Sequence, residues 1–174
     1  GASTINKAIP INVKANAICK LINNLTLDLG SILTVEGNGT FDNGGEYQVI
    51  NGGTSGSTSA ITVSGRFITQ DAEGFNGTGT AIPTIVPTLN AGSFVEFARA
   101  GNQVITNFTP KYKNVDITGT GTKTLGHATG IWVDENLKVA SSTLLVNTNE
   151  AITVNKAVNV TSGDIIGLGI PGVA

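Results

Sequence analysis

Acidic side chains are the first candidates for chemistry, because hydrolysis of a glycosidic bond uses two carboxyl groups that face the substrate together. Nine acidic residues are scattered over segments that suit turns: Asp28, Glu36, Asp42, Glu46, Asp71, Glu73, Asp116, Asp134 and Glu135. Neighbouring residues on a strand point to opposite faces, so Asp134 and Glu135 converge only if they occupy a turn. We therefore expect no catalytic residue and no enzyme activity.

His127 is the one histidine, so the sequence excludes a metal site with two histidines and leaves a single candidate for an imidazole base. The nucleophile motif Gly-x-Ser-x-Gly is absent. Residues 119–124, Gly-Thr-Gly-Thr-Lys-Thr, have the composition of a phosphate-binding loop, but that loop has four residues between its glycines and a lysine directly after the second. Because no helix pattern follows, we expect a turn between strands here, and a turn histidine at His127.

Metal and cofactor sites find little support in the sequence. Cys19 is the one cysteine, which excludes an intrachain disulfide and a cysteine metal cluster, and its apolar neighbours favour a small core residue. Residues 39–46 and 71–77 offer oxygen ligands for calcium, including the pair Asp42 and Glu46 and the pair Asp71 and Glu73. Neither loop has EF-hand spacing or the Gly-Gly-x-Gly-x-Asp repeat. We expect no cofactor and no metal, with calcium at these two loops as the open alternative.

Exposed aromatic side chains are the remaining candidates, because an aromatic ring can stack on a sugar ring. Trp132 lies between Ile131 and Val133 and points away from both on a strand, so it faces outward if they are buried. Tyr47 and Tyr112 are the other two candidates for ligand contact. The alternative for Trp132 is that it packs beneath residues 71–92.

Short strands are the elements that would position these side chains. Pairs of apolar residues separated by one residue begin at Ile131, Leu137, Leu144, Ile152 and Val158, which are 6, 7, 8 and 6 residues apart. Each pair indicates a strand with one buried face, and the spacers carry residues that suit turns. Helices do not fit this spacing, and no Asn-Gly or Asp-Gly turn joins the pairs as an antiparallel meander would require. Three segments summing to about 21 residues instead predict one coil of a parallel β-helix.

The predicted fold is therefore all-β: a single-stranded parallel β-helix, or β-solenoid, of about seven coils and on the order of 35 Å in length. We expect right-handed crossovers and asparagine ladders between coils. Residues 71–92 break the rhythm with two prolines and four glycines, so we predict one long loop insertion that bulges from the solenoid. The side chains expected to face inward are Ile117, Val133, Val139, Val146, Val154 and Val160.

Composition agrees with stacked strands and excludes several classes of partner. The 174 residues suit one domain, only 13% are charged, and β-branched residues are abundant. The net charge of -2 offers no footprint for nucleic acid or an anionic membrane surface, and no apolar run is long enough for membrane insertion. Because the chain starts with Gly-Ala-Ser and no methionine, we expect residues 1–174 to be a single solenoid segment, an excerpt of a larger protein.

A stretch of about 70 residues, 93–160, also carries a recognisable succession of motifs. These are V-x-F, Gly and Gln-x-Ile, then an aromatic residue, Asn-hydrophobic-x-Ile, Thr-x-x-Leu-Gly and finally Val-x-Gly-x-Leu-x-Val. The residues that match are Val95, Phe97, Gly101, Gln103, Ile105, Tyr112, Asn114, Val115, Ile117, Thr122, Leu125, Gly126, Val133, Leu137 and Val139. The chain departs from the pattern at Glu135, where the last motif has Gly, at Trp132, which adjoins a usually small position, and in residues 71–92.

In these motifs the stretch resembles repeat regions of large secreted Bacteroidetes surface proteins, the gliding and attachment adhesins exported by the type IX system. The resemblance implies a β-solenoid segment of an adhesin at the cell surface or outside the cell. It implies no catalytic residue.

Two functions follow as expectations. The first is a structural and adhesive segment of a bacterial surface protein, a stiff spacer able to contact an external surface or polysaccharide and joined to neighbouring repeats of the same polypeptide. The alternative is a polysaccharide-active β-helix enzyme or a carbohydrate-binding module. An enzyme should bring several carboxylates and a base together on one face, whereas a spacer should show scattered polar turns. The scattered acids favour the spacer.

Overall fold

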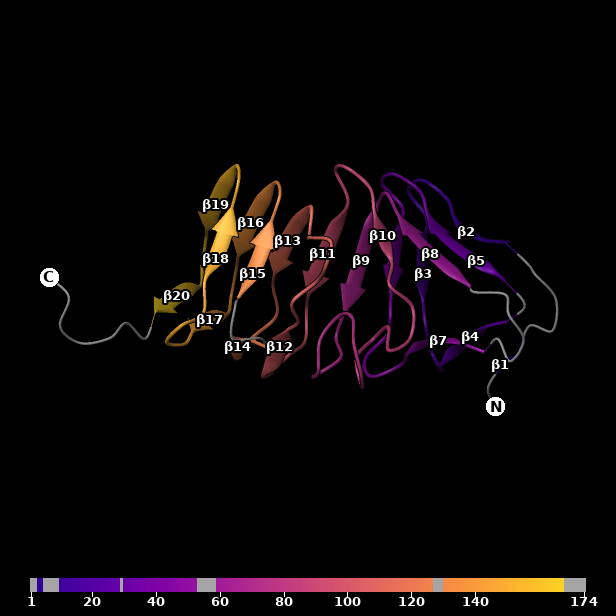
Figure 1. The fold of residues 1–174 in the computed structure, drawn as a ribbon, viewed down its shortest axis with the longest axis horizontal. Coiled ribbons are helices and arrows are strands. Elements are labelled where there is room, and N and C mark those ends of the chain that lie inside the picture. Colours follow the sequence, from indigo (N-terminus) through magenta and orange to yellow (C-terminus); the bar gives the residue numbers. More distant parts are fainter. Residues whose placement is uncertain (1–2, 5–9, 29, 53–58, 127–129, 168–174) are drawn as a thin grey trace, which may run out of the picture.

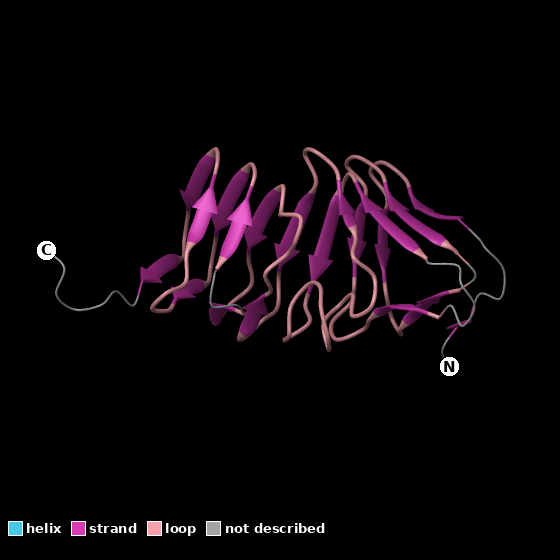
Figure 2. Ribbon diagram, in the orientation of Figure 1, coloured by secondary structure: helices cyan, strands magenta, loops and turns pink. Residues whose placement is uncertain are grey.

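A computed structural model describes residues 3–4, 10–28, 30–52, 59–126 and 130–167. These residues form strands, turns and loops but no helix, and therefore no helix that could span a membrane (Figure 2). The strands are β1 (Ser3–Thr4), β2 (Pro10–Val13), β3 (Ile18–Lys20), β4 (Leu25–Leu27), β5 (Ile32–Val35), β6 (Thr40–Asp42), β7 (Val49–Asn51), β8 (Ala60–Val63), β9 (Arg66–Thr69), β10 (Thr88–Leu89), β11 (Phe94–Phe97), β12 (Gln103–Ile105), β13 (Asn114–Ile117), β14 (Thr122–Leu125), β15 (Ile131–Val133), β16 (Asn136–Val139), β17 (Thr143–Val146), β18 (Ile152–Val154), β19 (Ala157–Val160) and β20 (Asp164–Gly167).

The strands wind into a parallel β-solenoid of about seven coils, as the sequence predicts (Figure 1). One face is an uninterrupted seven-stranded parallel sheet in the order β3-β6-β9-β11-β13-β16-β19, and we call it the long sheet. A second face holds β2-β5-β8-β10 and then β15-β18, and the third holds β1-β4-β7 and then β12-β14-β17-β20. Successive register partners in the long sheet are 22, 26, 28, 20, 22 and 21 residues apart, close to the predicted coil of about 21.

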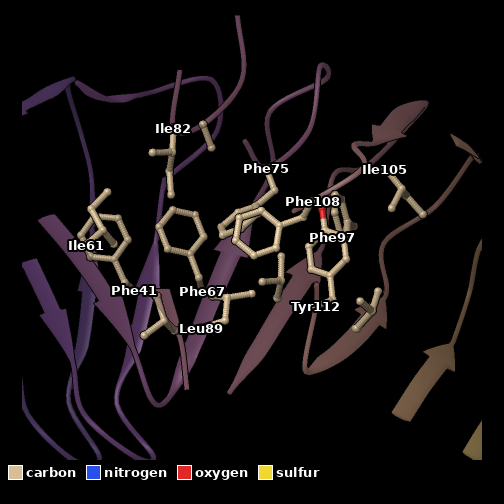
Figure 3. Packing of buried hydrophobic residues seen from close by; sticks show 14 of the residues in the cluster. Phe41, Ile61, Phe67, Phe75, Ile82, Leu89, Phe97, Ile105, Phe108 and Tyr112 are labelled. Carbon is tan, nitrogen blue, oxygen red and sulfur yellow. The ribbon is translucent and has the colours of Figure 1, made fainter. Parts of the chain in front are cut away.

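Alternation along each strand builds the core between the three faces. In β9 and β11 every second side chain is buried, because successive side chains on a strand point to opposite sides of the sheet. Aromatic rings then stack from coil to coil: Phe41 lies 5.2 Å from Phe67, and Phe67 lies 5.1 Å from Phe75, centroid to centroid. The row continues through Phe108 to Tyr112 in tilted and edge-on contacts (Figure 3). Offset and edge-on geometry is the arrangement that aromatic rings prefer.

The long loop predicted at residues 71–92 is a strand-free segment as far as residue 87, but its apolar side chains lie in the core and do not bulge away from the solenoid. Residues 71–87 contain no strand, but they complete the third face of their coil: the Val49 amide donates to Ala81 O, and the Val104 amide donates to Ala72 O, both at 2.8 Å. Phe75 and Ile82 are fully buried and point into the core (Figure 3). Prolines and glycines mark the irregular path of this segment, yet its apolar side chains anchor it inside. Residues 88–89 form β10, which pairs with β8.

The positions predicted to face inward behave differently along the stack. Ile117, Val133 and Val139 are buried, which confirms the prediction, whereas Val146 and Val154 are only partly buried against the core. Val160 is 48% exposed although it pairs in register with Val139. The reason is that no described coil covers the outer side of β18, β19 and β20.

The asparagine ladders predicted between coils are represented on the long sheet by one pair, Asn114 and Asn136. Asn136 Nδ2 donates to Asn114 Oδ1 at 2.8 Å, and Asn114 Nδ2 donates to the carbonyl of Ser93 at 3.1 Å. These bonds satisfy polar groups at the same corner of three successive coils.

Candidate functional site

Trp132 faces outward from β15, as predicted, and is 44% exposed. Gly130 precedes the strand with φ of 79°, and a Cβ there would collide with the backbone of Ala151, so glycine permits the close approach of the next coil. The segment before β13 lies beside β15 in a parallel bridge between Tyr112 and Val133, in which the Tyr112 amide donates to Trp132 O at 3.2 Å. This contact brings Lys111 Nζ to 3.4 Å from the centroid of the indole. Trp132 thus packs against Lys111, which differs from the alternative of packing beneath residues 71–92.

A small pocket opens beside this indole, with a volume of about 280 Å³. We call it the Trp132 pocket. Its polar and aromatic walls combine an amide, a hydroxyl, an ammonium and an indole, groups that can hydrogen-bond to and stack on a polar ring. The residues that line it are Asn107, Phe108, Thr109, Pro110, Lys111, Gly130, Ile131, Trp132 and Thr153.

The other two aromatic candidates do not join Trp132. Tyr112 is fully buried, and its hydroxyl donates to Thr106 O at 2.6 Å, so the prediction that it contacts a ligand is wrong. Burial raises the pKa of Tyr112 well above its ordinary value. Tyr47 is 36% exposed on the turn between β6 and β7, four coils from Trp132 and therefore about 19 Å away along the axis. One pocket cannot use both Tyr47 and Trp132.

Asp134 and Glu135 occupy the turn between β15 and β16, but each is bound to different partners. Asp134 Oδ2 accepts from Lys113 Nζ at 2.6 Å, and this hydrogen bond is the main reason that the pKa of Asp134 is lowered. Glu135 Oε1 accepts from the Gly92 amide at 3.0 Å, which is the main cause of its own lowered pKa, with Lys156 contributing a further hydrogen bond. Two ionised and separately paired carboxylates do not form an acid and base couple.

The structure brings together two other carboxylates that the sequence gave no reason to pair. Glu96 and Asp116 are register partners on β11 and β13, and both accept from Arg66 Nη1, at 2.6 and 2.7 Å. Burial lowers the pKa of Arg66, but its bonds and charge contacts with Asp116 and Glu96 outweigh this effect and raise it. We call these three residues the Arg66 cluster.

The Arg66 cluster meets only part of the criterion for an enzyme. Its two carboxylate oxygens lie within 2.7 Å of one nitrogen, so they are close enough for the pairing seen in retaining glycosidases, whose carboxyl groups are about 5–5.5 Å apart. In those enzymes the sugar lies between the two groups, whereas here the guanidinium occupies that space. Thr118 Oγ1 also donates to Glu96 Oε1 at 2.7 Å. The arrangement fixes the carboxylates and neutralises part of their charge.

The two candidate calcium loops meet, but only in part. Glu46, Asp71 and Glu73 line one pocket of about 390 Å³, and burial raises the pKa of Asp71. Asp71 Oδ1 already accepts from the Glu73 amide at 2.9 Å, and Glu46 pairs with Arg99 at 2.8 Å. Asp42 lies elsewhere and caps its own turn, accepting from the Gly44 amide. Among the described residues, no group of three or more Asp, Glu, His or Cys side chains is arranged to hold a metal ion.

Residues 119–124 form a turn leading into β14, as predicted, and their lysine has a role that the sequence did not suggest. Lys123 is fully buried, and its Nζ donates to the carbonyls of Arg99, Gly101 and Thr120 at 2.7, 2.7 and 3.1 Å. Burial, and then the charge of Arg99, lower the pKa of Lys123 to about 8. The signal was present in the alternation, because Lys123 and Leu125 share the inward face of β14.

Cys19 and His127 were the other two candidates in the sequence. Cys19 is a free, half-buried cysteine that packs on the core, and burial raises the pKa of its thiol. His127 lies outside the described residues. No family model, no curated protein and no solved structure matches the chain.

Proposed function

We propose that the chain is a stiff structural and adhesive segment of a bacterial cell-surface protein, which holds neighbouring repeats apart and contacts external glycans. The single observation that carries the proposal is the unbroken seven-stranded long sheet. Each coil adds one strand spacing of about 4.8 Å, so length grows with the number of coils while the cross-section stays the same. Such a body is suited to spanning distance.

The two ends of the solenoid support the proposal that it joins neighbouring repeats of the same polypeptide. The core side chains that remain only partly buried are Ile11, Cys19, Leu21 and Leu25 in the first coil and Val146, Ile152 and Val154 in the last two. A further coil stacked on either end would cover this apolar surface, and burial of apolar surface is the main driving force of association. The central coils need no such partner.

The rod can be tested with two spin labels on one column of the long sheet. Lys20 and Asn159 are linked through successive register partners across six strand spacings, about 29 Å apart. Labels at Lys20→Cys and Asn159→Cys, in a chain that also carries Cys19→Ser, should give one narrow distance distribution by electron paramagnetic resonance. A broad or bimodal distribution would contradict a stiff spacer.

The alternative of a polysaccharide-active enzyme draws on the Arg66 cluster, where two carboxylates and a basic residue share one face. Its test is the appearance of new reducing ends or unsaturated products in a panel of polysaccharides. We expect none from the unaltered chain. Turnover that disappears in Glu96→Gln or Asp116→Asn, or in variants of Asp134 or Glu135, would show that the chain is an enzyme and that the spacer proposal is wrong.

A further inference from the structure

Lys111 is an incompletely paired cation at the edge of the Trp132 pocket. Its closest carboxylate oxygen is Asp134 Oδ1 at 3.9 Å, and the other oxygen of Asp134 is held by Lys113 at 2.6 Å. Within the part of the chain that the structure describes, Lys111 Nζ makes no hydrogen bond, and its main contact is the face of the Trp132 indole. The ammonium therefore keeps donors free for a ligand.

The balance of charge around this pocket is positive. Among the residues that line it, Lys111 is the one with a charged side chain, and the carboxylate closest to it, that of Asp134, is held by Lys113. The wall of the pocket therefore carries a positive charge, in a chain whose net charge is -2.

Two other clusters contain more carboxylates than the cations paired with them. Arg66 faces two carboxylates, and Arg99 stands beside Glu46 next to the pocket that also holds Asp71 and Glu73. An anionic ligand would be repelled at those places. It would be attracted at the Trp132 pocket, because the sign of the local charge decides which ligand is favoured.

We propose that the Trp132 pocket binds an anionic sugar residue of an acidic polysaccharide, with Lys111 as the partner of its carboxylate or sulfate group. This inference rests on the proposed contact with glycans and names the class of glycan. Lys111 exchanges its contact with the indole for a hydrogen bond to the anion, which is favourable because a charge-assisted hydrogen bond is stronger than an exposed cation–π contact. Asn107 and Thr153 offer an amide and a hydroxyl to the ring, and the small volume admits about one sugar ring at a time.

Trp132 reports on this site directly, because it is the only tryptophan in the chain. Its emission should be followed while the protein is titrated with two matched pairs: dextran sulfate against dextran, and polygalacturonate against its methyl ester. We expect a saturable change with the charged member of at least one pair, a response at least tenfold weaker with the neutral member, and loss of affinity as salt rises from 20 to 300 mM. The two pairs also distinguish sulfate from carboxylate.

Lys111→Met is the decisive variant, and Lys138→Met is its matched control. Lys138 is an exposed lysine on the long sheet, so its loss changes the net charge equally without touching the pocket. We expect Lys111→Met to weaken binding of the charged polysaccharide at least tenfold and Lys138→Met to leave it within twofold. Thermal melting followed by circular dichroism checks that both variants fold.

Three outcomes would overturn the inference. If Lys111→Met and Lys138→Met lose affinity equally, binding is a general charge effect. Neutral polysaccharides could instead bind as well as charged ones, with binding to immobilised glycan lost in Trp132→Ala but not in Lys111→Met. In that case the pocket contacts glycans, but the inference that they are anionic is wrong. If neither class binds, the glycan contact of the proposed function fails as well, while the spin-label distance still tests the rod.

Discussion

The central coils and the last coil are built on the same alternation, yet only the central coils are closed. Phe67, Val95, Val115, Leu137 and Val158 form one inward column of the long sheet, in register from β9 to β19. The first four are buried, whereas Val158 is 50% exposed. In a solenoid, burial therefore depends on having a coil on both sides, and the type of residue alone does not decide it.

The polar contacts differ between the two regions in the same way. In the central coils Lys123 is buried in a ring of three carbonyls and Arg66 joins two carboxylates across three strands. At the first two coils, Lys14 pairs with Glu36 on the surface, where both side chains are well exposed. Removing one partner should lower the free energy of unfolding in the central coils, because the other group is left desolvated. At the ends the same change should have almost no effect on stability.

The largest expected effect is a charge placed in the central core. Ile117→Asp should destabilise the protein by about 4–5 kcal/mol or prevent folding, since an unpaired buried carboxylate has no compensation. Val160→Asp, in the same column two strands later, should cost no more than about 1 kcal/mol because that side chain is half exposed. Urea unfolding measures both, and equal losses would break the distinction between centre and end.

Truncation of the aromatic row comes next. Phe67→Ala removes a ring that contacts both Phe41 and Phe75, and it should cost about 3–5 kcal/mol. Val158→Ala, in the same inward column, is the control and should cost at most about 1 kcal/mol. If Phe67→Ala proves as mild as the control, the row does not hold the central coils together.

The buried lysine makes stability depend on pH. The native pKa of Lys123 is about 8, below the ordinary value of 10.5, so the unfolded chain binds more protons between these values and stability rises with pH. From pH 7 to pH 9.5 the free energy of unfolding should increase by about 2 kcal/mol. Lys123→Met should flatten this rise in urea titrations at each pH. A slope that persists unchanged in the variant would assign it to another group.

The smallest expected effect concerns the Arg66 cluster. Arg66→Met leaves Glu96 and Asp116 side by side without their shared cation and should cost about 1–2 kcal/mol at pH 7, less than a fully buried pair because Arg66 is partly exposed. Adding Glu96→Gln to the variant should recover part of the loss. Lys14→Met, at the exposed pair with Glu36, should leave the melting temperature unchanged. If Lys14→Met destabilised the protein as much as Arg66→Met, the distinction between central and terminal ion pairs would be wrong.

Much of the fold could be predicted because period-2 alternation and coil length are local properties of the sequence. Ile131 and Val133 facing inward, with Trp132 facing outward, follow from neighbouring residues alone. Phe75 and Ile82 could not be assigned to the core, since the prolines and glycines around them carry no strand pattern. Tyr112 lies in a segment without alternation, so nothing in the sequence indicated that its ring joins the aromatic row.

The contacts of the sites were less predictable than the strands. Arg66 meets Glu96 and Asp116, which are 30 and 50 residues further along the chain, because coil lengths bring them together in register. An error of one residue in any coil would separate them. Lys111 lies over Trp132 for a similar reason, because backbone hydrogen bonds of Tyr112 to Trp132 and Asp134 join two successive coils. Such pairings require the register, which composition and spacing leave open.

Hydrogen exchange along the long sheet tests the central claim most directly, because all seven coils contribute a strand to it. Amides of β9, β11 and β13 lie between coils on both sides, so they should exchange slowest and share the stability of the global unfolding reaction. Amides of β3 and β19 should exchange much faster, with protection rising from each end towards the centre. Uniform protection across the seven strands, or slowest exchange at β19, would contradict a rod that is held together by its central coils.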